Sequence, residues 1–136
     1  MEKIVKEGKN SDIVLGEILS ENDLQIEDVI YSTKLKKGKL FKSDSVEVTV
    51  YKKDELIEEI KKFLNELISN MGIEVSFELK KVEDRIIIKI YSDNNSILIG
   101  KNGNTIKALE EILRQYIITK YDIHFKVNLD VENYRE

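Results

Sequence analysis

The feature that most constrains the fold is a pair of glycines, Gly100 and Gly103, inside the segment LIGKNGNTI at residues 98–106. The chain has only 6 glycines in 136 residues, yet these two are separated by just a lysine and an asparagine. Glycine accepts backbone angles that other residues avoid, and it leaves the main chain bare. The GKNG loop (residues 100–103) therefore predicts either a tight corner between two helices or a place where a ligand approaches the backbone closely.

Apolar periodicity on both sides of this loop predicts the elements of residues 52–136. Apolar positions three and four apart indicate helices, whereas alternating positions indicate strands. The first expected element is a helix that is capped by Asp54 and ends near Gly72. Two strands follow, at 73–82 and 85–92, joined by a tight turn at Glu83–Asp84. A short helix at 96–100, a long helix that begins at Asn104 or Thr105, and a strand at 124–131 complete the order. The residues expected to face inward are Leu56, Ile60, Phe63, Leu64, Leu67 and Ile68 in the first helix and Ile106, Leu109, Ile112, Leu113, Tyr116 and Ile117 in the last.

Residues 1–51 show a second pattern, strand–helix–strand–strand. The strands are expected within EKIVKEG, VIYSTKL and SVEVTVY. The helix is expected to begin at Asn10 or Ser11, with Ile13, Val14, Ile18 and Leu19 at helical spacing. The sequence therefore predicts an α+β fold with two domains, at residues 1–51 and 52–136.

Charge and composition narrow the class of protein. A net charge of −4 and a pI near 5.2 exclude a protein that coats nucleic acid through bulk positive charge. The chain has no cysteine, so disulfides and thiolate metal sites are excluded, and no cofactor is expected. No apolar run approaches the roughly 18–20 residues of a membrane span, and no signal-peptide core is present. A soluble, cytoplasmic protein is expected.

The GKNG loop and the helix after it have the chemistry to bind phosphate. The start of a helix offers backbone N–H groups and the positive end of the helix dipole, and both attract anions. The only charged residues between positions 94 and 108 are two lysines. The residues predicted to contact a phosphate backbone are Gly100, Lys101, Asn102, Gly103, Asn104, Thr105 and Lys107.

Apolar residues beside the loop predict the floor of a cleft for unstacked bases. Leu98, Ile99 and Ile106 are expected to bury one side in the core and to expose an edge. The glycine spacing alone is weak evidence, because short helix–helix corners often carry glycines. A phosphate loop of the Walker type is disfavoured, since the sequence has no GxxxxGK[ST].

The segment L-I-G-K-N-G-N-T-I resembles the [IVL]-I-G-x-x-G-x-x-I core of the KH family, and the predicted element order is that of a type II KH domain. The longer segment SILIGKNGNTIKALEEIL and the tail LDVENYRE resemble the KH domain of the Jag family of bacterial RNA-binding proteins, also called KhpB. Residues 1–51 are similar in order and size to the N-terminal domain of that family, and the turn KKGKLF loosely resembles its Lys-Gly-Leu-Phe-type loop.

This resemblance implies binding of single-stranded RNA, with the GxxG loop clamping the backbone of about four nucleotides. It implies an RNA chaperone or post-transcriptional regulator linked to cell-envelope growth or sporulation. It further implies a small KH-only protein partner and a link to the membrane protein insertase. Formation of a homodimer would also raise the overall affinity for RNA. Family members continue past D-V-E-x-Y-R into a third domain with an Arg-x-x-x-His motif, whereas this sequence stops at Glu136. The sequence is then either a trimmed piece or a short natural form, and functions that need that domain are left open.

A protein-interaction adaptor is the alternative function. Residues 1–51 would then dock a protein partner, and the KH fold would serve as scaffold or dimer surface. The acidic pI favours the adaptor, whereas a GKNG loop without nearby acids favours RNA. Catalysis is not expected, because no Ser/His/Asp or Cys/His group can be assembled from the sequence.

The remaining candidates have structural interpretations. His124, the only histidine, is expected to be structural rather than a metal ligand. The pairs Glu58–Glu59 and Glu110–Glu111 are expected to face water, and Phe77, Tyr91 and Phe125 to belong to the core. The lysines at 36–42 are interpreted as solvated turn charges, with contact to RNA or to an acidic partner as the alternative. Arg114 and Lys120 could touch bound RNA.

Overall fold

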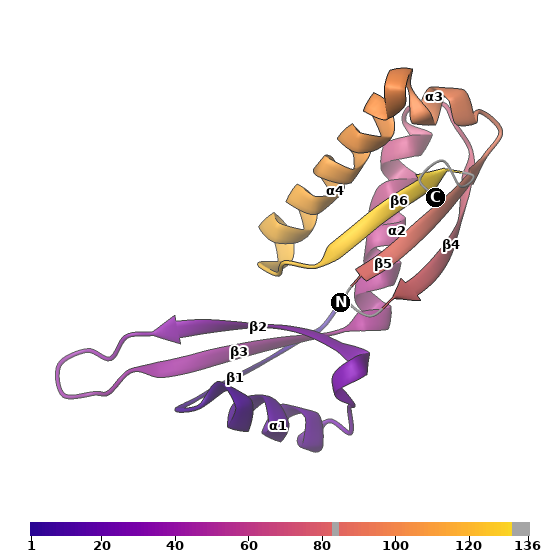
Figure 1. Cartoon of the computed structure of the whole chain (residues 1–136). Coiled ribbons are helices and arrows are strands. Elements are labelled where there is room, and N and C mark those ends of the chain that lie inside the picture. Colours follow the sequence, from indigo (N-terminus) through magenta and orange to yellow (C-terminus); the bar gives the residue numbers. More distant parts are fainter. Residues whose placement is uncertain (83–84, 132–136) are drawn as a thin grey trace. The chain divides into compact units, whose positions relative to one another are not determined.

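Helices and strands in the computed structural model follow the expected order in both halves of the chain (Figure 1). The structure describes residues 1–82 and 85–131. The chain divides into two units, Met1–Glu59 and Ile60–Glu136, so the boundary falls inside the helix Lys53–Ser69.

The first unit is a three-stranded antiparallel sheet with one helix against it. Its central strand is β3, which pairs with β1 on one side and β2 on the other. Helix α1 contacts β1 and β3. The elements are β1 (Lys3–Gly8), α1 (Ser11–Glu21), the 3₁₀ turn η1 (Ile26–Asp28), β2 (Val29–Lys36) and β3 (Ser45–Lys52).

Strand alternation and helix periodicity build the core of this unit. Val48 and Val50 point to the same face of β3 and are fully buried, because every second residue of a strand shares a face. Val14, Leu15 and Ile18 of α1 cover them. Ile13, which shares the helical spacing, instead lies exposed on the outer side of α1.

The second unit has the order helix–strand–strand–helix–helix–strand that defines a type II KH fold. Its elements are α2 (Lys53–Ser69) from Ile60 onward, β4 (Val75–Val82), β5 (Arg85–Ser92), α3 (Asn95–Ile99), the 3₁₀ turn η2 (Lys101–Gly103), α4 (Asn104–Tyr121) and β6 (Lys126–Val131). Helix α2 begins at Lys53, so Asp54 lies in its first turn and is not the cap. The predicted turn at Glu83–Asp84 and the tail at residues 132–136 lie outside the described residues.

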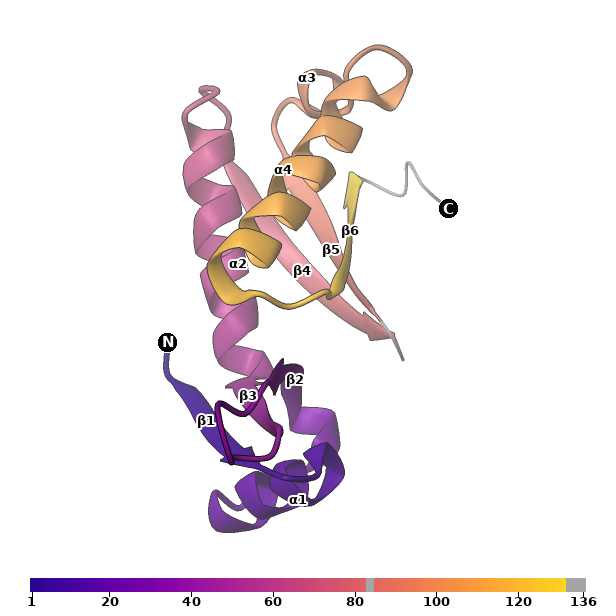
Figure 2. The ribbon, with the colours of Figure 1, turned by 90° about the vertical axis from the view of Figure 1, so that its left-hand side faces the viewer.

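The parallel pairing of β5 and β6 decides where the KH helices lie. The sheet has the order β4–β5–β6, with β4 antiparallel and β6 parallel to the central strand. A parallel neighbour requires a crossover, and α3, η2 and α4 supply it. Helix α4 therefore runs alongside β6, as Figure 2 shows.

Isoleucines of the sheet and one stripe of α4 form the core of the second unit. Ile86, Ile88 and Ile90 alternate along β5 and are buried, and each such side chain stabilises the fold by about 1.5–3 kcal/mol relative to exposure. The inward-facing prediction for α4 is wrong at Ile112, which is 44% exposed. Tyr116 is only half-buried, because its ring stacks on Phe63 at the surface with 3.9 Å between ring centroids.

We expect Asn10→Ala to lower the free energy of unfolding by about 1 kcal/mol, the usual cost of losing a helix N-cap. The Asn10 side-chain oxygen accepts hydrogen bonds from the N–H groups of Asp12 (2.9 Å) and Ile13 (3.1 Å). Urea denaturation followed by circular dichroism measures the change. Asn10→Asp keeps the acceptor and is expected to match the parent; equal losses in both variants would show that the cap is not the cause.

Candidate nucleic-acid interface

The GKNG loop forms the corner at which α3 ends and α4 begins. Helix α3 ends at Ile99, and the N–H of Gly100 donates to the carbonyl oxygen of Ser96 at 3.0 Å. The chain then makes the single 3₁₀ turn η2, closed by the N–H of Gly103 on the carbonyl oxygen of Gly100 at 3.3 Å. The corner thus follows an ordered hydrogen-bonded path.

The geometry of this corner requires glycine at position 100 and favours it at position 103. Gly100 has φ +71° and Gly103 has φ +75°, in the left-handed region that side chains disfavour. A Cβ atom on Gly100 would lie only 2.1 Å from Oγ1 of Thr105. The glycine pair is therefore explained by the fold, and evidence for a ligand has to come from what the corner exposes.

The corner exposes polar and cationic side chains. Lys101, Asn102, Asn104 and Lys107 all lie on the surface. Asn102 adopts φ +56°, a left-handed conformation that asparagine tolerates better than most residues, and this conformation sets it at the tip of the turn. Two ammonium groups and two amides therefore lie at one end of α4, with no carboxylate in the sequence between positions 94 and 108.

The start of α4 is suited to an anion. Its N-cap residue is Gly103, so no side chain caps the helix, and the main-chain N–H of Asn104 donates to the carbonyl oxygen of Lys101. The positive end of the helix dipole is thus left without a compensating side-chain oxygen, next to Lys101. A phosphate at this position would supply the missing negative charge.

The expected apolar floor is only partly available. Leu98 and Ile106 are 0% exposed, because both point into the core beneath the corner, so neither presents an edge to a ligand. Ile99 is half-buried, and its neighbour Ile97 is 50% exposed. The apolar surface beside the GKNG loop therefore comes from Ile97 and Ile99. Thr105 is half-buried and packs against Gly100.

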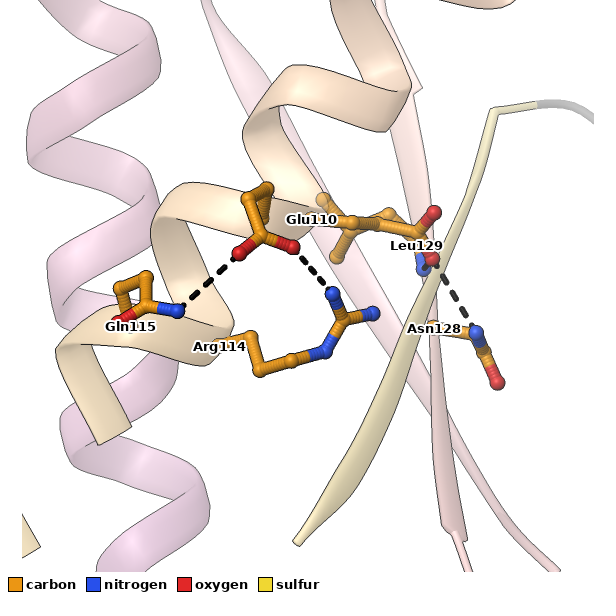
Figure 3. A network of polar contacts seen from close by, with 6 residues as sticks. Glu110, Arg114, Gln115, Asn128 and Leu129 are labelled. Carbon is orange, nitrogen blue, oxygen red and sulfur yellow. Dashed lines mark hydrogen bonds and ion pairs between the residues drawn. The ribbon is translucent and has the colours of Figure 1, made fainter. Parts of the chain in front are cut away.

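A buried carboxylate joins α4 to β6. Glu110 was expected to face water, but it is buried, and its Oε2 accepts a hydrogen bond from the main-chain N–H of Leu129 at 3.1 Å. The same oxygen accepts one from the side-chain amide of Asn128 at 3.2 Å (Figure 3). Glu111, one residue on, is exposed and pairs with Arg114. Of these two adjacent acids, Glu110 thus attaches α4 to β6, whereas Glu111 forms a surface ion pair.

A second cationic feature lies farther along α4. A recess of about 450 Å³ is lined by the basic side chains Arg85, Arg114, His124 and Lys126 together with apolar Ile118 and Phe125. These residues come from β5, α4, the segment before β6 and β6 itself, so no short sequence motif predicts that they lie together. Arg114 was the only one singled out as an RNA contact; the others would be found only from the parallel β5–β6 register, which pairs Arg85 with Lys126.

The structure also places the other candidate residues. His124 lies just before β6, is exposed and lines the recess. Tyr91 is exposed, and its hydroxyl donates to Glu78 at 2.7 Å, whereas Phe77 and Phe125 are half-buried. The ammonium group of Lys120 lies over the rings of Tyr116 and Tyr121, at 5.4 and 5.6 Å from their centroids.

Comparison with known proteins agrees with this architecture. Residues 57–131 match the family model described as KhpA/KhpB, KH domain. The chain is 33% identical over 67 residues to a protein of Clostridium symbiosum named RNA-binding protein KhpB. That alignment covers 49% of this chain but only 30% of the relative, so the chain spans less than a third of that protein's length. Among the described residues, no helix is both long enough and apolar enough to cross a membrane.

We expect Gly100→Ala to destabilise the second unit by about 1–3 kcal/mol, because the new methyl group meets Thr105 and the backbone is held at positive φ. Asn102→Gly is the matched control, since glycine accepts the φ of +56° at that position without strain. Urea denaturation gives both values. Equal stability of Gly100→Ala and the parent would mean that the corner is softer than its packing indicates.

We expect Glu110→Ala to cost about 1–3 kcal/mol of unfolding free energy, because it leaves the buried N–H of Leu129 without its acceptor. The neighbouring Glu111→Ala removes an exposed carboxylate and should stay within about 0.5 kcal/mol of the parent. Chemical denaturation measures the free energy of unfolding of both variants, which differ in the burial of the carboxylate that is removed. Similar losses of stability in the two variants would contradict the role given to Glu110.

Proposed function

The chain belongs to the KhpA/KhpB family of KH domains, and from this premise we propose that it binds single-stranded RNA at the GKNG loop. The observation that carries the proposal is the uncapped start of α4, which sits beside exposed Lys101 and Asn102. A relative of the chain is named as an RNA-binding protein, which supports the same ligand class. RNA is a chain of phosphates and apolar base faces, and the corner offers a partner for each.

In the proposed complex, phosphates lie against the GKNG loop. The N–H groups of Gly103 and Asn104 already donate within the corner. The proposed donors are therefore the main-chain amides of Lys101 and Asn102 and the Asn102 side chain. Lys101 and Lys107 supply the charge, and the dipole of α4 adds to it.

The bases would rest on apolar surface next to the loop. Ile97 and Ile99 are the side chains with exposed area there, and they replace the wider floor expected from the sequence. Arg114 lies ten residues beyond Asn104 on α4, which is about 15 Å at 1.5 Å per residue. An RNA strand that leaves the loop along α4 would therefore reach the recess, where Arg114 and His124 can meet a further phosphate.

Binding by one such surface is expected to be weak. Two or three phosphate contacts give affinities on the order of micromolar or weaker at physiological salt. A second module, a homodimer or a small KH-only partner would raise the effective concentration. The finer role proposed is that of a cytoplasmic RNA chaperone or post-transcriptional regulator, linked to cell-envelope growth or sporulation.

An adaptor that docks a protein, with the membrane protein insertase as one candidate, is the second proposal. The acidic net charge of −4 favours it, because RNA is repelled by the rest of the chain. It predicts that changes in the GKNG loop leave partner binding intact.

We expect the double variant Lys101→Asp, Asn102→Asp to weaken binding of short labelled single-stranded RNA by about tenfold or more, since it places negative charge where phosphate should lie. Fluorescence anisotropy measures the dissociation constant, and circular dichroism checks the fold. If two phosphates are contacted, raising salt from about 50 to about 200 mM should weaken parent binding by roughly sevenfold.

The matched control is Lys62→Asp, Asn65→Asp on the exposed side of α2, which makes the same change in net charge within the KH elements. It should bind RNA much more tightly than the loop variant. If both variants lose affinity equally, overall charge is responsible and the loop is not the clamp. If the parent binds no RNA even at low salt, the adaptor proposal takes its place.

A further inference from the structure

The connection between β2 and β3 exposes two large apolar side chains at its tip. Leu40 is 97% exposed and Phe41 is 103% exposed, the highest values among the large apolar residues that the structure describes. Isolated apolar residues on a surface are common, but an adjacent pair with almost no protein contact is unusual. We call residues 36–42 the lysine–apolar tip.

The backbone holds this pair outward at the corner of a turn. The N–H of Lys42 donates to the carbonyl oxygen of Lys39 at 3.2 Å, so Leu40 and Phe41 occupy the two central turn positions. Glycine, asparagine and aspartate are the usual residues at such positions. Leu40 has φ +57°, which a bulky side chain avoids unless something else requires it.

Hydrogen bonds order the connection behind the tip. The N–H of Gly38 donates to Oδ1 of Asp44 at 2.9 Å. The Lys9 ammonium group donates to the carbonyl oxygen of Asp44 at 3.2 Å and also to the Ser43 hydroxyl. A Cβ atom on Gly38 would fall 1.9 Å from the carbonyl oxygen of Lys42, so the two sides of the connection lie close together. The apolar pair is thus presented by an ordered turn.

Positive charge surrounds the apolar pair. Lys36, Lys37, Lys39 and Lys42 lie within seven consecutive residues that contain no acid. Lys36 pairs with Glu47 at 2.8 Å, which raises the pKa of Lys36. In the described part of the chain the other three ammonium groups form no ion pair. The tip is therefore cationic on a chain whose net charge is −4.

We propose that the lysine–apolar tip binds the surface of an anionic phospholipid bilayer. Leu40 and Phe41 would enter the boundary between headgroups and acyl chains, while Lys37, Lys39 and Lys42 lie at the level of the lipid phosphates. An apolar apex with a cationic base matches that boundary, where negative charge lies directly above hydrocarbon. RNA could use the lysines and stack on Phe41, but it offers nothing for an exposed leucine at a projecting turn. This inference does not depend on the RNA proposal.

Attachment through one tip should be reversible, because a short apolar insertion and a few lysines give marginal membrane affinity singly and useful affinity together. Removing either component should therefore nearly abolish binding. Zwitterionic vesicles should bind poorly, and salt should weaken attachment by screening the lysines.

The chain has no tryptophan, so Phe41→Trp creates a single fluorescent reporter at the tip. Phe41 has no packing to lose, and the fold should be retained. The Phe41→Trp variant of the 136-residue chain is titrated with vesicles of phosphatidylglycerol and phosphatidylcholine, and separately with phosphatidylcholine alone. We expect a blue shift and protection from iodide quenching with the anionic vesicles only. Ile13→Trp, at an exposed position on α1, is the matched reporter and should show neither change.

Vesicle sedimentation of the unlabelled chain gives the affinity. Leu40→Ser, Phe41→Ser and, separately, Lys37→Gln, Lys39→Gln, Lys42→Gln should each weaken binding by about tenfold or more. Ile13→Ser, Ile26→Ser removes two exposed apolar side chains elsewhere in the first unit and should bind as the parent does. The GKNG variant Lys101→Asp, Asn102→Asp should also bind vesicles normally.

The proposal is overturned if the parent binds neither kind of vesicle, or if the Leu40→Ser, Phe41→Ser variant binds as well as the parent. Loss of RNA affinity in that variant, without vesicle binding by the parent, would assign the tip to RNA instead.

Discussion

The KH unit depends on the positive φ angles of Gly100 and Gly103 at the corner between α3 and α4, which glycine adopts with the least strain. Gly100 and Gly103 both have positive φ, and Thr105 fills the space that a side chain on Gly100 would need. This corner turns the chain between α3 and α4 over the three residues of η2, and α4 packs against β6. The carboxylate of Glu110 then fastens the helix to the strand. The surface offered to a ligand follows from this turn, because the side chains of Lys101 and Asn102 in η2 are exposed.

The order of elements could be read from the sequence because it depends on local signals. Periods of 3.6 and 2, a capping asparagine at position 10 and glycines at helix ends are all short-range features. Whether an individual side chain is buried or exposed was harder to predict. Leu98 and Ile106 were expected to show an edge, and Glu110 to face water, yet all three are buried. Glu110 is buried against β6, which comes from another part of the chain, and a helical pattern carries no information on that partner. The recess around Arg114 has the same origin.

The distribution of charge matters more than its sum. The chain is acidic overall, but lysines collect at the start of α4 and at the connection between β2 and β3. Because ions in solution screen charge over about 8 Å at physiological salt, a polyanion close to either place senses the local lysines before the distant acids. The negative net charge of the chain then mainly disfavours the non-specific binding of polyanions elsewhere on its surface. A ligand that presents negative charge in the wrong geometry meets repulsion from the rest of the surface.

The parallel pairing of β5 with β6 has a consequence for the order in which the chain becomes folded during synthesis. The three strands of the first unit are complete once β3 has been made, but β5 must wait for a partner that follows more than thirty residues later. At about 5–20 residues per second, that interval is roughly two to seven seconds. Throughout it the isoleucine-rich strand β5 has one open edge, which is the kind of edge on which chains join one another. The nascent KH unit is thus most vulnerable to aggregation just before β6 emerges, when all three strands of the first unit have already been synthesised.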